Sequence, residues 1–307
     1  MIDENRNPSI PSPARVAVLG AGGVGGVLAG LLARAGHDVT VVASERSAAA
    51  LDARGGRIRV ASGALGDAEE TVRVVTHLEE PADLTLVTVK HTGMPEALDR
   101  VPVEFAGVVV PFLNGFEHVD VLRGRYGADR VPAATVQVEA TRVGDGEFEH
   151  TSSFLRISLS DHPASEAAAA VLRDCSTEVR VGGSDGEVMW NKLALLAPMA
   201  LLTGGLDATM GEVLDNHREL YDAAVDESAA IAAAEGATNG RDGIDAVMTA
   251  FPADGTTSLA RDLDAGRATE ADAIGEAVIR AGRSHGLPTA TLEDLLARVR
   301  DREAAGR

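Results

Sequence analysis

The stretch RVAVLGAGGVGGVLAGLLARAGHDVTVVA, residues 15–43, decides the fold. It opens with an apolar run typical of a buried strand, passes through a glycine-rich turn into an Ala/Leu-rich helical stretch, and ends in a second β-rich run. The glycines of the turn fit G-x-G-x-x-G directly after the first strand and at the start of the helix. In that position the pattern predicts a dinucleotide-binding site, whereas alone it is also compatible with a purely structural turn.

Five residues of this turn form the predicted phosphate site: Gly20, Gly22, Gly23, Val24 and Gly25. Gly20 permits the tight turn, Gly22 lets the backbone approach a pyrophosphate, and Gly25 lets the helix and the strand pack closely. The start of the helix supplies free N–H groups to the phosphates.

Beyond this stretch, β-rich runs continue to alternate with helical ones. Further strands are expected at IRVA (58–61), DLTLVTV (83–89) and GVVVPFL (107–113). Strands separated by helices predict the α/β class, here a Rossmann-type doubly wound parallel sheet with helices on both faces. Residues 133–159 have antiparallel character, and we expect them to close the sheet edge, with a turn at 144–146.

Strand character disappears near residue 182, and the remaining sequence is typical of helices. We therefore predict a flexible tail over 1–14, a dinucleotide-binding Rossmann-like domain over 15–182, and an all-helical substrate and catalytic domain over 183–307. A cleft is expected between the two domains.

The composition narrows the possible partners. Among 307 residues, 28 Lys and Arg stand against 47 Asp and Glu, a formal net charge of −19. Nucleic acid and anionic membranes bind to basic surfaces, so neither is expected as a partner. No apolar run is long enough to cross a bilayer, and the polar N-terminus is unlike a secretion signal, which favours a soluble, cytoplasmic protein. Cys175 is the only cysteine, so no disulfide and no cysteine-based metal cluster is expected. Assembly into a homodimer is compatible with the sequence.

The residues after the second strand bear on the choice of nucleotide. An acidic residue about 20 positions after the glycines would hold the ribose diol of NAD. The sequence at this position is Ser44-Glu45-Arg46. Ser44 and Arg46 suit a 2′-phosphate and favour NADPH, whereas Glu45 suits a 2′-hydroxyl, so NADH is not excluded. A solvated loop is the structural alternative.

Lysine occurs only at Lys90 and Lys192, and the other basic residues are arginines. An arginine is sufficient where only a positive charge is needed. Both lysines are therefore candidates for a function that requires an ammonium group, which can lose its proton. Lys90 follows the strand at 84–89, and Asn114 follows the strand at 108–113. Open α/β sheets bind ligands at such carboxyl ends, although a strand-end Asn-Gly is also an ordinary turn.

Lys192 stands in VMWNKLALLAPMALLTGG (188–205), which is apolar on every face and therefore predicts a buried helix. A lysine there must reach solvent or face a cleft with a partner, because an unpaired buried ammonium is costly. Glu270 is a candidate partner. An ordinary explanation also exists for this acid, since Thr269 suits the N-cap of a helix over 270–285.

Taken together, these segments resemble the ketopantoate reductase (2-dehydropantoate 2-reductase) family. The resemblance runs in order from Arg15 to about Thr291. It rests on VLGAGGVGGVLAGLLARAGHDVTVV, LTLVTVK, FLNGFEHVDVL, RVGDGEFEH, WNKLALLAPMALLTG, SLARDLDAGRATEADAI and HGLP. The run around Ser258–Glu270, together with W-x-K-L, is more specific than the glycine motif.

The resemblance implies NADPH-dependent reduction of the ketone of a 2-oxo acid. Lys192 would be the general acid, Glu270 the acid beside it, and Ser258 a substrate-binding hydroxyl. Lys90 and Asn114 match positions at the nicotinamide end of the cofactor pocket, and Asn114 also borders the substrate. Hydride delivery to a carbonyl carbon builds negative charge on the oxygen, which an ammonium can stabilise and protonate.

Several substrate-site positions depart from the family pattern. The family asparagines four and eight residues after the lysine are Leu196 and Ala200 here, and two further ones fall on Met210 and Gly255. A site without these amides lacks partners for hydroxyl groups and discriminates against a polyhydroxylated acid. We therefore expect a substrate less polar than ketopantoate.

Two alternatives remain at this point. The same lysine could protonate the nitrogen formed by reduction of a C=N bond. A non-enzymatic NADP(H)-sensing regulatory protein would keep the nucleotide site and lose the substrate site; the lost asparagines favour it, and the retained Lys192, Ser258 and Glu270 oppose it.

Overall fold

The computed structural model describes residues 9–306, which form two compact units. One unit contains the described chain up to Leu113 and His118–Asp185, and the other contains Asn114–Glu117 and the chain from Gly186 onward. The division therefore falls between 185 and 186, whereas the sequence suggested 182 and 183. The four residues 114–117 group with the helical unit, although their neighbours in sequence belong to the other one.

The predicted tail over 1–14 is only partly described. Residues 1–8 lie outside the described residues. Ala14, at the other end of the tail, is fully buried, and its N–H donates to His37 Nδ1 at 3.1 Å. The chain is thus already anchored to the first unit one residue before the first strand.

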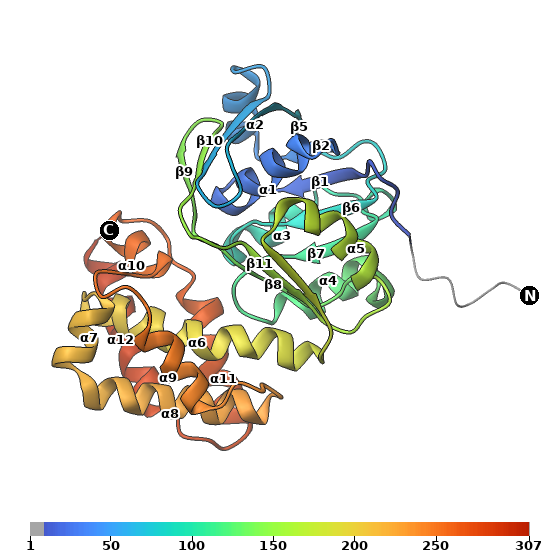
Figure 1. The fold of residues 1–307 in the computed structure, drawn as a ribbon. Helices are drawn as coiled ribbons and strands as arrows, with labels where there is room; N and C mark the ends of the chain where they lie inside the picture. The colour runs from blue at the N-terminus through green and yellow to red at the C-terminus, as the bar shows by residue number, and fades with distance from the viewer. Residues whose placement is uncertain (1–8, 307) are drawn as a thin grey trace, which may run out of the picture. The chain divides into compact units, whose positions relative to one another are not determined.

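The first unit is built on a five-stranded sheet in which every pairing is parallel. In spatial order its strands are β5 (Arg73–Val75), β2 (Asp38–Val42), β1 (Arg15–Leu19), β6 (Leu84–Val87) and β7 (Val108–Pro111). The order reverses between β1 and β6, which is where doubly wound sheets bind ligands. The α/β, doubly wound fold predicted from the sequence is confirmed (Figure 1).

Both faces of this sheet are buried, as its near-continuous apolar strands require. Along β1, Val16 and Val18 pack in one core cluster, and Ala17 and Leu19 pack in another. Each fully buried Val or Leu contributes about 1.5–3 kcal/mol. The helices of this unit are α1 (Gly23–Arg34), α2 (Glu45–Asp52), α3 (Met94–Leu98), α4 (His118–Tyr126) and α5 (Ser165–Leu172), with short 3₁₀ turns at His91–Gly93, Val103–Phe105, Ala128–Arg130 and Arg173–Cys175.

The remaining strands do not close the edge of the parallel sheet, which corrects the sequence prediction. They form a four-stranded sheet, β4 (Ala68–Thr71), β3 (Arg57–Ser62), β10 (Glu147–His150) and β9 (Ala140–Gly144), and a three-stranded sheet, β12 (Glu178–Val181), β11 (Arg156–Leu159) and β8 (Ala134–Gln137). The residues of β3 alternate between exposed and buried, the pattern of a strand with one solvated face. The predicted turn is present, since β9 and β10 pair antiparallel across Asp145-Gly146.

The second unit is helical, as predicted. Its helices are α6 (Asp185–Leu206), α7 (Met210–Asn216), α8 (Arg218–Ala234), α9 (Arg241–Thr249), α10 (Ser258–Asp264), α11 (Ala277–Ser284) and α12 (Ala290–Ala305), with a π-helical turn at Asp272–Glu276. Among residues 9–306, no single helix is long and apolar enough to span a membrane; only α6 and α7 taken together meet that test, and they are bent by 81°.

Helix α6 passes through Pro198, which has no N–H to donate to the carbonyl of Ala194 one turn earlier. The hydroxyl of Ser228, fully buried on α8, donates to that carbonyl at 2.9 Å. The neighbouring helix therefore satisfies the acceptor that proline leaves open. This keeps α6 continuous along the segment that carries Lys192.

Candidate active site

Lys192, Asn114 and Glu270 form one hydrogen-bonded chain inside the helical unit. Lys192 Nζ donates to Asn114 Oδ1 at 3.0 Å, and Asn114 Nδ2 donates to Glu270 Oε2 at 2.8 Å. The three residues come from α6, from the segment after β7, and from the residues before the π-helical turn. The sequence singled out all three, but it paired Lys192 with Glu270; the structure places the amide of Asn114 between them.

The orientation of the Asn114 amide follows from the chemistry of its two partners. An ammonium only donates hydrogen bonds, and an ionised carboxylate only accepts them. The amide oxygen must therefore face Lys192, and the amide nitrogen must face Glu270. The chain has one consistent direction of donation, from lysine through asparagine to glutamate.

Burial lowers the pKa of Lys192 from its ordinary value to about 8, and the nearby negative charge of Glu270 opposes this shift. Desolvation penalises the charged form of an amine, so a lysine on an apolar helix loses its proton more readily than one in water. An amine with a pKa near 8 can both hold and release a proton close to neutral pH.

The substrate positions predicted on α6 follow Lys192 at helical spacing. Leu196 and Ala200 lie four and eight residues after it, so all three side chains share one helix face. Leu196 is partly buried and Ala200 is fully buried. This face beyond Lys192 is apolar at both positions.

Ser258 is the exposed first residue of α10, and within residues 9–306 it makes no hydrogen bond to Lys192, Asn114 or Glu270. The hydroxyl that meets α6 belongs instead to its buried neighbour Thr257, whose Oγ1 lies 3.0 Å from Thr203 Oγ1. Neither hydroxyl of this pair was predicted from the sequence. The sequence feature that could have indicated this pair is Thr203, because it is the only hydroxyl residue in the apolar stretch 188–205.

The predicted phosphate site lies in the first unit, at the carboxyl end of β1. Gly20 has a φ of +112°, and a Cβ there would lie 2.9 Å from Val89. At Gly25 an added Cβ would come within 2.1 Å of the Gly20 carbonyl oxygen. At Gly22 it would meet nothing within 4 Å, so the space beside this backbone is open.

Helix α1 begins at Gly23, and its N-cap residue Gly22 has no side chain to cap the helix. The first N–H groups of a helix have no intrahelical acceptor, so those of Gly23 and Val24 are available to an anion. Open space beside Gly22 together with these donors fits the pyrophosphate of a dinucleotide.

Thr88, two residues before Lys90, ties the end of β6 to the glycine turn. Its hydroxyl lies within hydrogen-bond distance of the carbonyl oxygens of Leu19 and Gly20, at 3.0 and 3.1 Å. Thr88 was not among the residues predicted from the sequence. Lys90 itself is exposed and precedes the 3₁₀ turn at His91–Gly93.

The residues proposed to read the nucleotide lie where β2 passes into α2. Ser44 is the N-cap of α2, and its Oγ accepts from the Ser47 N–H at 3.4 Å. Glu45 and Arg46 are exposed in the first turn of that helix. A hydroxyl, a guanidinium and a helix N-terminus thus stand together at the end of the second strand.

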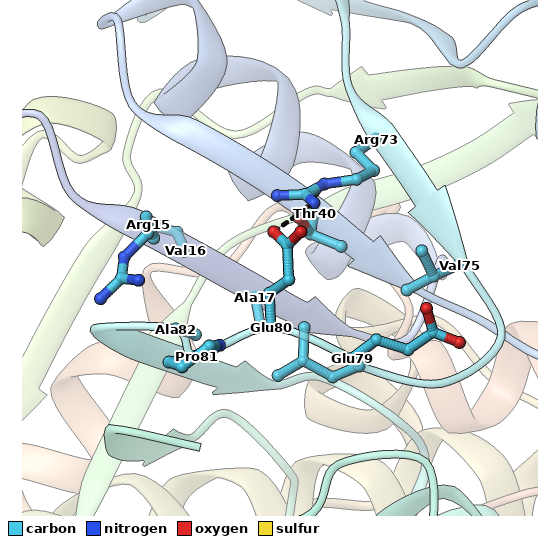
Figure 2. Close-up of a pocket in the computed structure, with 11 residues that line it drawn as sticks. Arg15, Val16, Ala17, Thr40, Arg73, Val75, Glu79, Glu80, Pro81 and Ala82 are labelled. Carbon is cyan, nitrogen blue, oxygen red and sulfur yellow. Dashed lines mark hydrogen bonds and ion pairs between the residues drawn. The ribbon is translucent and has the colours of Figure 1, made fainter. Parts of the chain in front are cut away.

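A cavity of about 120 Å³ in the first unit contains none of these residues (Figure 2). It is lined by residues of β1, β2 and β5 and by residues 78–82. Its two arginines already have partners, because Arg73 donates to Glu80 at 2.6 Å and Arg15 donates to Asp83 at 2.7 Å. We assign no part of the reaction to it.

Comparison with known proteins covers both units. The family model described as "Ketopantoate reductase PanE/ApbA" matches residues 16–164, and the model described as "Ketopantoate reductase PanE/ApbA C terminal" matches residues 187–303. A 2-dehydropantoate 2-reductase from Caulobacter vibrioides is 31% identical over 290 residues, which are 89% of this chain and 94% of that protein.

Solved structures agree with this relationship. A PanE/ApbA family ketopantoate reductase from Ralstonia eutropha JMP134 has a TM-score of 0.84 at 26% identity, covering 95% of this chain and 99% of the other. A D-mandelate dehydrogenase in a ternary structure with NADH and anilino(oxo)acetate has the same fold, with a TM-score of 0.83 at 20% identity, covering 95% and 99% of the two chains. The chain belongs to the ketopantoate reductase family of oxidoreductases.

Proposed function

We propose that this protein reduces the ketone of a 2-oxo acid with NADPH, and that its substrate is less polar than ketopantoate. The observation that carries the proposal is the chain from Lys192 through Asn114 to Glu270. An amine held in this way, with a pKa near 8, suits protonation of an oxygen that gains negative charge.

The nicotinamide cofactor supplies the hydride. Lys192 uses one N–H to hold Asn114 Oδ1, which leaves two N–H groups to bind the carbonyl oxygen of the substrate. Its positive charge stabilises the oxygen as hydride arrives, and its proton completes the alcohol. Glu270 fixes the amide of Asn114, so that the amide oxygen stays directed at the amine.

The choice of a less polar substrate rests on the face of α6 beyond Lys192. Leu196 and Ala200 offer no hydrogen bond, and Met210 is fully buried with its backbone N–H donated to the Gly255 carbonyl. A hydroxyl group placed against such side chains would lose its bonds to water without replacement. A 2-oxo acid with an aliphatic or aromatic side chain avoids this cost.

NADPH is the proposed nucleotide because Ser44 and Arg46 stand together after β2. A guanidinium pairs with a 2′-phosphate through charge-assisted hydrogen bonds, and the N-terminus of α2 adds a favourable dipole. Glu45 is the residue that would accept a hydrogen bond from the 2′-hydroxyl of NADH. Comparing the kinetics with NADPH and with NADH therefore tests the choice of nucleotide.

A panel of 2-oxo acids tests the proposal, with oxidation of NADPH as the readout. The panel contains ketopantoate, branched aliphatic 2-oxo acids, and phenylglyoxylate, the oxo acid that corresponds to mandelate. We expect turnover with an apolar member, a lower kcat/KM for ketopantoate, and near-complete loss in Lys192→Ala. Tight NADPH binding without turnover of any oxo acid or cyclic imine would overturn the assignment as an enzyme.

A further inference from the structure

Residues Asn114–Glu117 belong to the helical unit, although the residues on both sides belong to the other one. Asn114 binds Lys192 and Glu270, as described above. Of the three residues that follow, Phe116 contacts α6, which carries Lys192, whereas Gly115 and Glu117 contact the chain that follows Glu270. These contacts fix the position of Asn114, and the position of Asn114 in turn fixes the direction of the Lys192 amine.

Phe116 makes the aromatic contact of this segment. Its ring centroid lies 4.9 Å from that of Trp190, with the two ring planes inclined by 40°. Trp190 is only 2% exposed and precedes Lys192 by two residues on α6. Such tilted pairs have a preferred geometry in addition to the surface they bury, so Phe116 fixes the segment against the helix that carries the amine.

Gly115 brings the same segment against the chain after Glu270. It has a φ of +84°, and a Cβ at this position would lie 2.5 Å from the carbonyl oxygen of Ala273 in the π-helical turn. The two backbones therefore touch directly. This close approach lies one residue after Asn114 and three residues after Glu270.

Glu117 contributes a weaker attachment. Its carboxylate accepts from Arg280 Nη2 at 2.8 Å and from Nε at 3.2 Å. The carboxylate side chain is 39% exposed and the arginine 46% exposed. Because water screens an ion pair of this kind, we assign the position of residues 114–117 on the helical unit mainly to the contact made by Phe116.

We propose that Phe116 is a positioning residue for the reduction: its ring, packed at a tilt against Trp190, holds the amide of Asn114 at hydrogen-bond distance from Lys192. This inference rests on the proposed function. Removing the ring frees the segment, loosens the bond from Lys192 to Asn114, and admits water to the amine. The amine then becomes easier to protonate, because less of the charge is desolvated.

The scarcity of lysine allows a direct test. With lysine labelled at ¹³Cε, the protein gives two lysine signals, one from Lys90 and one from Lys192, and Lys90→Arg assigns them. In Phe116→Ala we expect the pKa of Lys192 to rise from about 8 toward that of an ordinary lysine. We expect kcat to fall at least tenfold, with little change in the KM for NADPH. Phe116→Tyr, which keeps the ring, should restore both.

Glu117→Gln is the matched control in the same segment, and it should change kcat less than threefold. Phe116→Leu keeps most of the apolar volume without the ring. It replaces Phe116→Ala in the same measurements if the alanine variant is poorly folded. The inference is overturned if Phe116→Leu lowers the melting temperature while the Lys192 titration and kcat per folded enzyme stay at wild-type values. Since the titration needs no substrate, it tests the inference even if the wild type reduces no oxo acid.

Discussion

Lys192 and Glu270, 78 residues apart in the chain, are joined through one amide, because Asn114 accepts from the amine at 3.0 Å and donates to the carboxylate at 2.8 Å. The amide transmits orientation without carrying a charge. It separates the two ionised groups, so the ammonium is not committed to a direct ion pair and remains available to substrate. Asn114 is therefore as central to the proposed reaction as the two ionisable residues.

Replacing Asn114 with alanine should lower kcat by about 10²-fold, the lower end of the contribution expected from positioned acid–base catalysis. Lys192 would lose the acceptor that directs it. Asn114→Asp is the informative partner variant, since it places a carboxylate beside the amine and should raise the pKa of Lys192. Steady-state kinetics across pH check both variants. Wild-type kcat in Asn114→Ala would show that the amide is dispensable.

The rate of reduction should fall as pH rises through about 8. Lys192 donates a proton in the proposed step, so only its protonated form is active, and its pKa is about 8. Above that value kcat should drop about tenfold for each pH unit. In the reverse direction, oxidation of the alcohol needs the neutral amine and should gain rate over the same range. A flat profile in both directions would remove Lys192 from proton transfer.

The same lowered pKa predicts a cost in stability. Between pH 8 and 10.5 the unfolded chain holds the Lys192 proton more firmly than the folded protein, so stability rises with pH across this window. Below pH 8 the full penalty applies, at most about 3 kcal/mol. Lys192→Met should therefore be inactive and more stable. Urea unfolding followed by the fluorescence of Trp190, the only tryptophan, measures the gain, with Lys90→Met as the exposed control.

Ser228→Ala should destabilise the helical unit by about 1–3 kcal/mol, because the Ala194 carbonyl would be left buried without a donor. A double-mutant cycle with Pro198→Ala separates this effect from simple loss of packing. Alanine at 198 restores the backbone N–H for that carbonyl, so removing the Ser228 hydroxyl should then cost less. Equal costs in both backgrounds would mean that the hydroxyl does not serve the acceptor left open by proline.

Much of this architecture is predictable from the sequence because its signals are local. The glycine turn, the apolar strands and the all-apolar helix around Lys192 each depend on neighbouring residues, and the structure has the predicted α/β and helical units. The separate sheet around β3 was missed, although Arg57 and Arg59 alternate with buried residues and indicate a strand with one wet face. That alternation was the available signal.

Relationships between distant segments were harder to predict. Thr269 was expected to cap a helix starting at Glu270; its hydroxyl does accept from the Ala271 N–H, but the first turn is π-helical and begins at Asp272. The position of Asn114 between Lys192 and Glu270 depends on how three segments pack. The Phe116–Trp190 contact depends on packing in the same way, and no periodicity encodes either.

Arg46→Ala should raise the KM for NADPH at least tenfold and leave that for NADH nearly unchanged. The guanidinium is proposed to pair with the 2′-phosphate, which NADH lacks, and such pairs are charge-assisted. Because Arg46 is exposed, the preference for NADPH in the wild type should weaken as salt is added. Equal effects on both nucleotides would assign Arg46 to the surface of α2 and not to nucleotide selection.

Leu196→Asn should move specificity toward hydroxylated oxo acids. The side chain lies one turn beyond Lys192 on the same face of α6, and an amide there supplies the donor and acceptor that the apolar face lacks. A site able to hydrogen-bond a substrate hydroxyl gains strongly over one that cannot, so kcat/KM for ketopantoate relative to an apolar 2-oxo acid should rise at least tenfold. Leu195→Asn is the matched control, because the adjacent residue projects from a different side of the helix and should leave the ratio unchanged. If both variants shift the ratio equally, the change reflects general loosening of α6, and the polarity of the Leu196 face does not select the substrate.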